Sequence, residues 1–338
     1  MPNAKNRTKG RNSAPKKKSR PESHTASQEK VAVLSPCATL YAKSLVDPWI
    51  DYAPCLPSAQ AFESRRLRVW SSGTVARGNT GSNTGFITYS PGLAIANDIP
   101  CVYVTDGNYA GSTIDIGAAG VTGHTSNSDY ASADLSAVGV QARLVSAGIR
   151  IKYTGTELER GGRFVGLEEP EHGNTLSMNI ADLKSHSSYS MHTTPSGDKY
   201  LQLVISGPKN PTETDFTPTL SGNLCTNMNF FLAIIFDGGG ASFPLEYEVV
   251  SNFEVIGNKV QGKVMGHHDP IGAGAVQQAL TQIAAKSMSM VQSGQMNNKL
   301  ARVWQGVKSI LTNSITTILP KAGVYGKLAL GAGQLLLA

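Results

Sequence analysis

Residues 143–166, RLVSAGIRIKYTGTELERGGRFVG, decide the fold class of this chain. The first half alternates apolar residues with polar or small ones, the apolar positions being Leu144, Ile149, Ile151 and Tyr153. This alternation is typical of a strand with one face in a core and the other in solvent. Residues 157–162 carry charges and a Gly pair, which allows a reversal, and residues 163–167 begin a second strand. The stretch therefore predicts a β-hairpin in an antiparallel sandwich.

The same kind of pattern extends from Arg65 to about Ile256. Candidate strands are Arg65–Val75, Gly85–Ser90, Ile99–Thr105, Thr113–Ile116, Arg143–Thr154, Arg163–Leu167, Tyr200–Ser206, Asn229–Phe236 and Glu246–Ile256. Clusters rich in Gly, Ser, Asn and Pro separate them. We predict an all-β fold, a single two-sheet jelly-roll domain over residues 65–262. A lectin-like or immunoglobulin-like sandwich is the alternative, although the Cys–Trp–Cys spacing of immunoglobulin domains is absent from the sequence.

Charge divides the chain into three parts. Residues 1–30 carry nine Lys or Arg against two Glu, residues 31–298 carry sixteen against twenty-two acids, and residues 299–338 carry five basic residues and no acid. A basic tail, an acidic body and a basic end indicate three different partners.

The first part, residues 1–37, is predicted to be a disordered basic arm, because residues 1–30 hold almost no apolar side chain that could offset the ordering entropy. Its candidate RNA ligands are Lys5, Arg7, Lys9, Arg11, Lys16, Lys17, Lys18 and Arg20. Eight contacts to single-stranded phosphates would give log K a slope of about −5 to −6 against log salt. A nuclear-localisation tract or a plain solvated tail is the alternative.

The C-terminal region, residues 263–338, has helical tendency. Residues 271–293 repeat apolar side chains at three- and four-residue steps. From residue 299 a second apolar face follows, formed by Leu300, Val303, Trp304, Val307, Ile310, Leu311 and Ile315, and continuing to Pro320. Such a helix suits a membrane interface better than a span. Packing beneath the sandwich as an ordinary core or interface helix is the alternative.

Motifs for turnover chemistry do not stand out. Neither a phosphate-loop spacing nor a nucleophile elbow is present, and His267, His268 and Asp269 are adjacent, which favours a polar hinge over a metal site. Cys37, Cys55, Cys101 and Cys225 have no CxxC pairing and are expected to be buried or free thiols in a reducing compartment. The N-terminus lacks an apolar signal-peptide region, and no uninterrupted apolar run reaches a membrane span.

Four strings resemble one family. VSAGIRIKYTGTELERGGR, FFLAIIFDGGGASFPLEYEVVSNFEVIG, the LVDPW segment before the β region, and ARVWQGVKSIL are similar to segments of capsid proteins from nodavirus-like and tombusvirus-like small icosahedral RNA viruses. The resemblance implies a shell domain that self-assembles into an icosahedral homo-oligomer in the host cytoplasm and resides in the virion. It also implies that residues 38–64 link the arm to the shell, that the arm binds viral genomic RNA, and that residues 299–338 disrupt a host endosomal membrane.

The family also implies a single-turnover autocleavage at an Asn, assisted by a buried carboxyl group of raised pKa. Asp47 lies where the resemblance implies the carboxylate. Measured back from Trp304, the position implied for the cleaved Asn holds Leu300, and the nearest candidates are Asn297 and Asn298; if Asn298 is used, Lys299 replaces the small residue that usually follows the cleaved bond. The alternative is that Asp47 caps the linker and the chain stays whole. No cofactor is required, and Ca²⁺ at subunit interfaces would use loop acids such as Asp98, Glu213 and Asp215, whose spacing defines no site. The rival function is a cellular nucleic-acid-binding β-sandwich protein with a membrane-associating C-terminal helix.

Overall fold

The computed structural model describes residues 35–44, 47–50, 53–57, 63–79, 84–136, 139–158, 160–168, 176–185, 189–193, 200–205, 215–220, 223–224, 232–238, 244–257, 260–265, 269 and 291–292. The helices are α1 (Pro36–Ser44), α2 (Ser132–Leu135) and α3 (Ile180–Ser185), with a 3-10 turn η1 (Leu93–Ile95). The strands are β1 (Glu63–Ala76), β2 (Thr84–Tyr89), β3 (Val102–Thr105), β4 (Val121–His124), β5 (Gln141–Tyr153), β6 (Arg163–Glu168), β7 (Tyr189–Thr193), β8 (Tyr200–Ile205), β9 (Thr217–Leu220), β10 (Asn223–Leu224), β11 (Leu232–Asp237), β12 (Pro244–Ile256), β13 (Val264–Met265) and β14 (Val291–Gln292).

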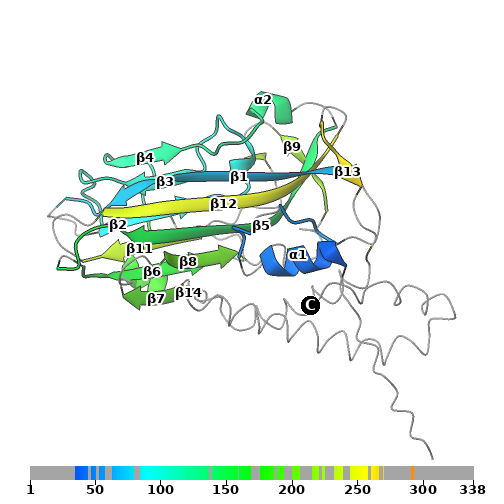
Figure 1. The fold of residues 1–338 in the computed structure, drawn as a ribbon. Coiled ribbons are helices and arrows are strands. Elements are labelled where there is room, and N and C mark those ends of the chain that lie inside the picture. Colours follow the sequence, from blue (N-terminus) through cyan, green and yellow to red (C-terminus); the bar gives the residue numbers. More distant parts are fainter. Residues whose placement is uncertain are drawn as a thin grey trace, which may run out of the picture. The chain divides into compact units, whose positions relative to one another are not determined.

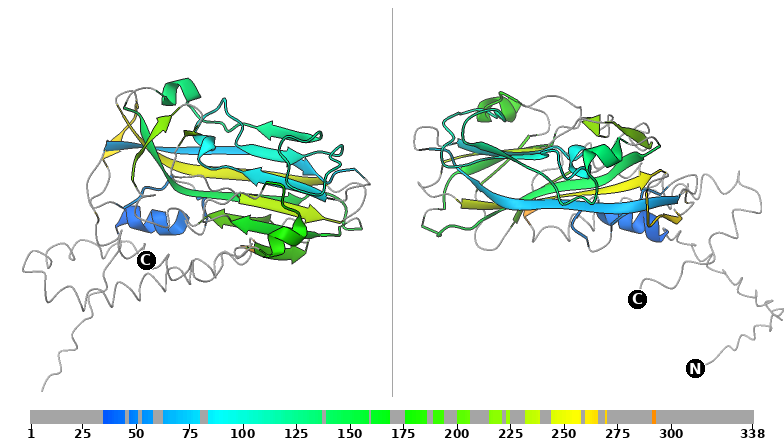
Figure 2. Two further views of the ribbon diagram at one scale, coloured as in Figure 1. Left: turned by 180° about the vertical axis from the view of Figure 1, so that it is seen from behind. Right: turned by 90° about the horizontal axis from the view of Figure 1, so that it is seen from above.

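The strands form two antiparallel sheets stacked face to face (Figures 1 and 2). The eight-stranded sheet has the order β10-β9-β5-β12-β1-β13, with β8 paired to β5 and β14 paired to β8. The six-stranded sheet has the order β4-β3-β2-β11-β6-β7. Long strands β1, β12 and β5 run side by side through the centre of the larger sheet. This two-sheet antiparallel arrangement confirms the predicted all-β sandwich.

The main core lies between the sheets. It takes Leu67 and Val69 from β1, alternate residues of β5 and β12, and side chains of β2 and β11 from the opposite sheet. Inward positions follow a period of two along each strand, as in any pleated sheet. Burial of these side chains is the main source of the fold's stability.

Both sheets are also covered on the face that points away from this core. On the six-stranded sheet, Leu183 of α3 and the loop residues Tyr109 and Ile114 pack with Phe86, Val165 and Ile235. On the eight-stranded sheet, the central residues 142–149 of β5 are buried on both faces. The expectation that this strand has one solvent face is therefore wrong in its centre.

The predicted hairpin of residues 143–166 is also wrong. β5 and β6 do not pair with each other: β5 pairs with β12 in the larger sheet, while β6 pairs with β11 and β7 in the smaller one. The polar stretch between them carries the chain from one sheet to the other. The β11–β12 connection makes the same crossing, and Gly162 and Gly238, both at positive φ, lie against each other where the two connections meet. A Cβ on Gly162 would lie 2.6 Å from the Asp237 carbonyl oxygen.

Other expectations differ from the structure locally. Residues 113–116 form a loop whose Ile114 backbone bonds to Ser177 and Met178, and the strand that pairs with β3 is β4 instead. Short strands β7, β9 and β10 were not predicted. Two-residue strands β13 and β14 lie within the region expected to be helical, where the helical prediction fails at Val264–Met265 and Val291–Gln292. The remainder of residues 271–338 lies outside the described residues.

Candidate functional site

The outward face of the eight-stranded sheet is covered by an N-terminal segment, which we call the covering segment (residues 35–44, 47–50 and 53–57). α1 forms its first part, and non-helical chain follows. The segment follows the basic residues 1–30 in the sequence. Its contacts with the sheet form the best-defined polar site among the described residues.

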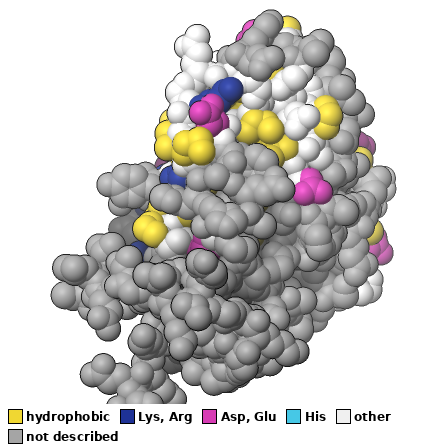
Figure 3. Space-filling view, turned by 90° about the vertical axis from the view of Figure 1, so that its right-hand side faces the viewer, with side chains coloured by type: hydrophobic (Ala, Val, Ile, Leu, Met, Phe, Trp, Pro, Cys, Tyr) yellow, Lys and Arg dark blue, Asp and Glu magenta, His cyan; other side chains and the backbone are white. Residues whose placement is uncertain are grey.

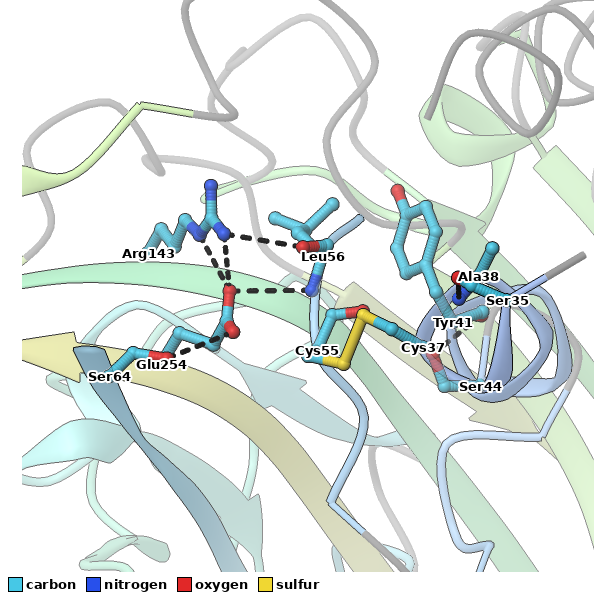
Figure 4. The surroundings of a disulfide bond; sticks show 10 residues. All are labelled: Ser35, Cys37, Ala38, Tyr41, Ser44, Cys55, Leu56, Ser64, Arg143 and Glu254. Atoms are coloured by element: carbon cyan, nitrogen blue, oxygen red, sulfur yellow. Dashed lines mark hydrogen bonds and ion pairs between the residues drawn. A yellow bond between two sulfur atoms is a disulfide. The ribbon is translucent and has the colours of Figure 1, made fainter. Parts of the chain in front are cut away.

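An ion pair between Arg143 of β5 and Glu254 of β12 is the centre of this site (Figure 4). Arg143 Nε donates to Glu254 Oε2 over 2.7 Å, and the two side chains are only 7% and 2% exposed. Two charges withdrawn from water are stable only when their remaining hydrogen-bonding capacity is met. Here Ser64 donates to the second oxygen of Glu254, and the Arg143 guanidinium lies 4.4 Å from the ring centre of Phe216.

The covering segment completes this ion pair. The Leu56 amide donates to Glu254 Oε2 over 3.3 Å, and Arg143 Nη2 donates to the Leu56 carbonyl over 3.4 Å. One residue of the segment thus uses both of its backbone groups on the two buried charges, as Figure 4 shows. Because both backbone groups of Leu56 bond to these buried charges, we infer that the ion pair fixes residue 56 at this point on the sheet.

Pro48 and Trp49 make a second attachment. Asn252 Nδ2 donates to the Pro48 carbonyl and to Ser146 Oγ, both over 3.0 Å. Gly148 lies directly beneath: a Cβ there would meet Pro48 Cγ at 2.6 Å and the Trp49 ring at 2.8 Å. A glycine is therefore required at residue 148 for the segment to approach the strand this closely.

The Trp49 ring extends this attachment to charged side chains. The Arg150 guanidinium lies 4.7 Å from the Trp49 ring centre and 4.4 Å from that of Tyr200, and it pairs with Glu248. A guanidinium between two aromatic rings combines cation–π attraction with an ion pair.

The start of the covering segment is closed by a disulfide between Cys37 of α1 and Cys55, 18 residues apart (Figure 4). The prediction of free thiols is wrong for these two residues, since sequence spacing did not show that α1 folds back beside residue 55. Cys101 is free and buried, as predicted, and Cys225 lies outside the described residues. The Cys37–Cys55 pair therefore gives no support to a reducing compartment.

Three buried groups of the core have altered acidity. Burial raises the pKa of the Cys101 thiol to about 12. It raises the pKa of the Tyr89 and Tyr247 phenols as well, that of Tyr89 most strongly. These groups stay protonated at neutral pH, and their role is packing.

The proposed cleavage pair is only partly placed. The Asp47 carboxylate accepts a hydrogen bond from the Trp49 amide over 3.0 Å, the local turn expected of a residue that caps the linker. Asn298 lies outside the described residues, as do the eight basic residues of the arm and the seven apolar residues from Leu300 to Ile315.

The acids named for calcium are also only partly placed. Asp98 accepts hydrogen bonds from the side chain and backbone of Ser132, which lower its pKa. Asp215 is exposed, and Glu213 lies outside the described residues. Within the described ranges, the acidic, His and Cys side chains form no cluster of three that could hold a metal ion. No helix in this part of the chain is long and apolar enough to span a membrane.

Exposed apolar side chains mark the remaining surface. Trp70, in the middle of β1, is 51% exposed, and Leu158, Val264 and Met265 are exposed elsewhere. Figure 3 views the end of the sandwich at which β13 lies and shows hydrophobic side chains in separate groups beside acidic and basic ones. Single exposed apolar residues of this kind are ordinary on a protein surface.

The sequence did not predict that the covering segment is held by four strand residues, namely Arg143, Gly148, Asn252 and Glu254. Two signals were available. Ser146 and Gly148 are small residues at alternate positions of an otherwise apolar strand, which indicates close approach of other chain. Glu254 is a lone acid inside the apolar run VVSNFEVI, where burial demands a cationic partner.

Comparison with known proteins gives a match in structure only. No protein-family profile and no curated protein matches the sequence. The VP2 subviral particle of infectious bursal disease virus superimposes with a TM-score of 0.51 at 10% identity, covering 79% of this chain and 99% of that chain. The structure of the Gt strain of the same virus gives 0.51 at 9% identity, covering 76% and 96%. A mud crab tombus-like virus structure reaches only 0.29, at 8% identity and 68% and 92% coverage, which is too weak to argue from. The neighbours of this chain are viral capsid proteins, and the chain shares their jelly-roll fold.

Proposed function

We propose that this chain is a structural capsid protein that self-assembles into an icosahedral shell. The observation that carries the proposal is the superposition on VP2, which spans 99% of that chain. A fold alone does not specify function, so the basic composition of residues 1–30 adds a second support. These residues precede in sequence a segment that is bonded to the sheet at Leu56 and Pro48, and such a segment would tether a nucleic-acid-binding tail to a shell.

The finer parts of the proposal come from the sequence. Lys and Arg residues of the arm neutralise viral genomic RNA, the helix at 299–338 acts on a host endosomal membrane, and Ca²⁺ at subunit contacts is an optional addition. Assembly takes place in the host cytoplasm, and the product is the virion. The rival, a cellular nucleic-acid-binding sandwich with a membrane-associating helix, predicts a monomer or small oligomer.

Negative-stain microscopy of the expressed chain, with its intact mass measured on the same sample, tests the proposal. Uniform hollow spheres a few hundred ångströms across support a capsid. A protein that stays monomeric at high concentration, with and without RNA, contradicts it and leaves the rival.

The same mass tests autocleavage at Asn298. Loss of residues 299–338 supports it, provided that Asp47→Asn and Asn298→Ala each keep the chain whole. An uncleaved chain in fully assembled particles removes Asp47 and Asn298 from the proposal and leaves Asp47 as a linker cap.

A further inference from the structure

The two parts of the covering segment are held in different ways. Residues 48–56 are bonded to the sheet through backbone groups. In α1, by contrast, polar groups bond within the helix: the Ala38 amide donates to Ser35 Oγ over 3.1 Å, and the Ser44 hydroxyl donates to the Tyr41 carbonyl over 2.8 Å. A helix of nine residues is only marginally stable by itself, so α1 depends on its attachment to the domain.

The covalent part of that attachment is the Cys37–Cys55 disulfide. Cys55 directly precedes Leu56, whose amide and carbonyl bond to the buried ion pair, so the disulfide joins α1 to a firmly held point of the segment (Figure 4). Its two ends are 18 residues apart. Closing a loop of this length removes chain entropy from the state in which α1 is undocked, and this favours the docked helix.

The same place accommodates the reduced residues. Cys37 Sγ lies 3.2 Å from the Cys55 carbonyl oxygen, so a thiol at residue 37 has a hydrogen-bond acceptor in place. The bonds of the sheet to Leu56 and Pro48 involve no sulfur atom. Residues 48–56 can therefore stay on the sheet when the disulfide is reduced, whereas α1 loses its covalent attachment.

Access to the disulfide is linked to the position of α1. Cys37 is 2% exposed and Cys55 is fully buried. Thiol–disulfide exchange requires a thiolate to reach one of the two sulfur atoms, which a small thiol can do only after α1 has moved away. In the other direction, docking of α1 returns the two Cα atoms to 5.7 Å, a separation that a disulfide spans. Undocking of α1 and reduction of the disulfide are thus coupled.

We propose that Cys37 and Cys55 form a reversible disulfide latch, which fixes α1 to the domain in an oxidising environment and releases it in a reducing one. In the release step a glutathione thiolate attacks one of the two sulfur atoms, and the bond between Cys37 and Cys55 breaks. A second glutathione resolves the mixed disulfide. One protein disulfide and two glutathione thiols become two protein thiols and one glutathione disulfide, so two electrons and two protons pass to the protein.

The setting of the latch rests on the proposed capsid function. A chain that assembles in the cytoplasm meets a reducing environment, and a virion outside the cell meets an oxidising one, so both states of the pair arise. Release of α1 moves the first attached residue from Pro36 to Pro48, which is 12 positions. At about 3.3–3.6 Å per residue, the basic residues 1–30 gain at most about 40 Å of reach. The redox state of one residue pair would thus set how far the RNA-binding residues extend from the domain.

Hydrogen exchange of the full chain, measured by mass spectrometry in buffers of reduced and oxidised glutathione, tests the latch. Thiol alkylation of the same samples gives the state of the pair. An excess of oxidised glutathione should produce the Cys37–Cys55 disulfide, and an excess of reduced glutathione should produce both thiols. On reduction the backbone amides of residues 39–44 should lose protection roughly 100-fold, the effect expected for opening a loop of this length. The Leu56 amide and the amides of β12 should keep their protection.

Variants of the cysteines provide the controls. Cys37→Ser and Cys55→Ser should show the low protection of α1 in both buffers, whereas Cys101→Ala, which removes a buried thiol elsewhere in the core, should respond to glutathione like the unaltered chain. The latch is refuted if the redox state of the pair does not follow the buffer, or if reduction leaves the protection of α1 unchanged. Equal loss of protection at Leu56 and in α1 would also refute it, because the whole covering segment would then leave as one unit. Each of these results leaves the capsid function standing, since that function fails only if the unaltered chain does not assemble.

Discussion

Replacement of Glu254 by Gln is the sharpest test of how the covering segment is held. Gln keeps the size of the side chain and an oxygen that can accept from Leu56, but it leaves the Arg143 guanidinium, 7% exposed, without its counter-charge. Removing one partner of a buried ion pair costs about 3–5 kcal/mol. With a urea m-value of about 3 kcal/mol/M, the unfolding midpoint should fall by about 1–2 M.

Glu246→Gln is the matched control, because it makes the same substitution on the same face of β12, at an exposed position opposite Lys152. It should cost less than about 0.5 kcal/mol. In the double variant Arg143→Met with Glu254→Leu, most of the lost stability should return, since no uncompensated charge remains. A loss of stability in Glu254→Gln no larger than in Glu246→Gln would refute a cost of the unpaired Arg143 charge. So would a loss in the double variant equal to the sum of the losses in the two single variants.

Three further predictions concern packing, the disulfide and pH. Gly148→Ala should lower stability by about 1–3 kcal/mol in urea unfolding, because its methyl group collides with Pro48, whereas Gly107→Ala, which meets no atom within 4 Å, should be nearly neutral. Intact mass and thiol counting without reductant should show Cys37 joined to Cys55, and Cys37→Ser should cost about 3 kcal/mol for a loop of this length; four free thiols in the native protein would contradict the pairing. Burial raises the pKa of the Cys101 thiol to about 12, above its value of about 8.5 in the unfolded chain. The contribution of the protonated thiol to the free energy of unfolding is therefore complete below about pH 8.5 and is lost as the pH rises toward 12. The urea midpoint of unfolding should therefore decrease as the pH is raised from about 8.5 to about 11, and it should decrease less steeply in Cys101→Ala. Identical slopes in the two proteins would refute the role given to the Cys101 thiol.

The fold could be predicted from the sequence because alternation marks strands locally. Eight of the nine candidate strands overlap observed ones, and the exception, residues 113–116, has the right burial but bonds to a loop. Pairing was harder to predict. A polar turn with glycines suits a hairpin and a crossing between sheets equally well. Residues 154–162 make the crossing because the partner strands β11 and β12, which begin 70 and 82 residues after residue 162, lie in different sheets.

The site could be predicted less well because its parts are distant in sequence. The LVDPW segment was predicted to be a linker, but nothing in its sequence shows that the Pro48 carbonyl meets Asn252. Likewise, the spacing of Cys37 and Cys55 has no motif, and only the return of the chain past α1 brings them together. The basic arm and the amphipathic helix expected within residues 299–338 stay predictions from the sequence, because both lie outside the described residues.

The bond between Leu56 and Glu254 also sets an order of events during synthesis. The two residues are 198 positions apart, so the acceptor does not exist until nearly the whole sandwich has been translated. At about 5–20 residues per second, the ribosome needs roughly 10–40 s to cover that distance. During this interval the Leu56 amide lacks its acceptor on the sheet, whereas β5, whose Gly148 and Arg150 contact the covering segment, has already been made. Attachment of the covering segment at Leu56 therefore reports that β12 is in place, and a chain that stalls before residue 254 lacks this attachment.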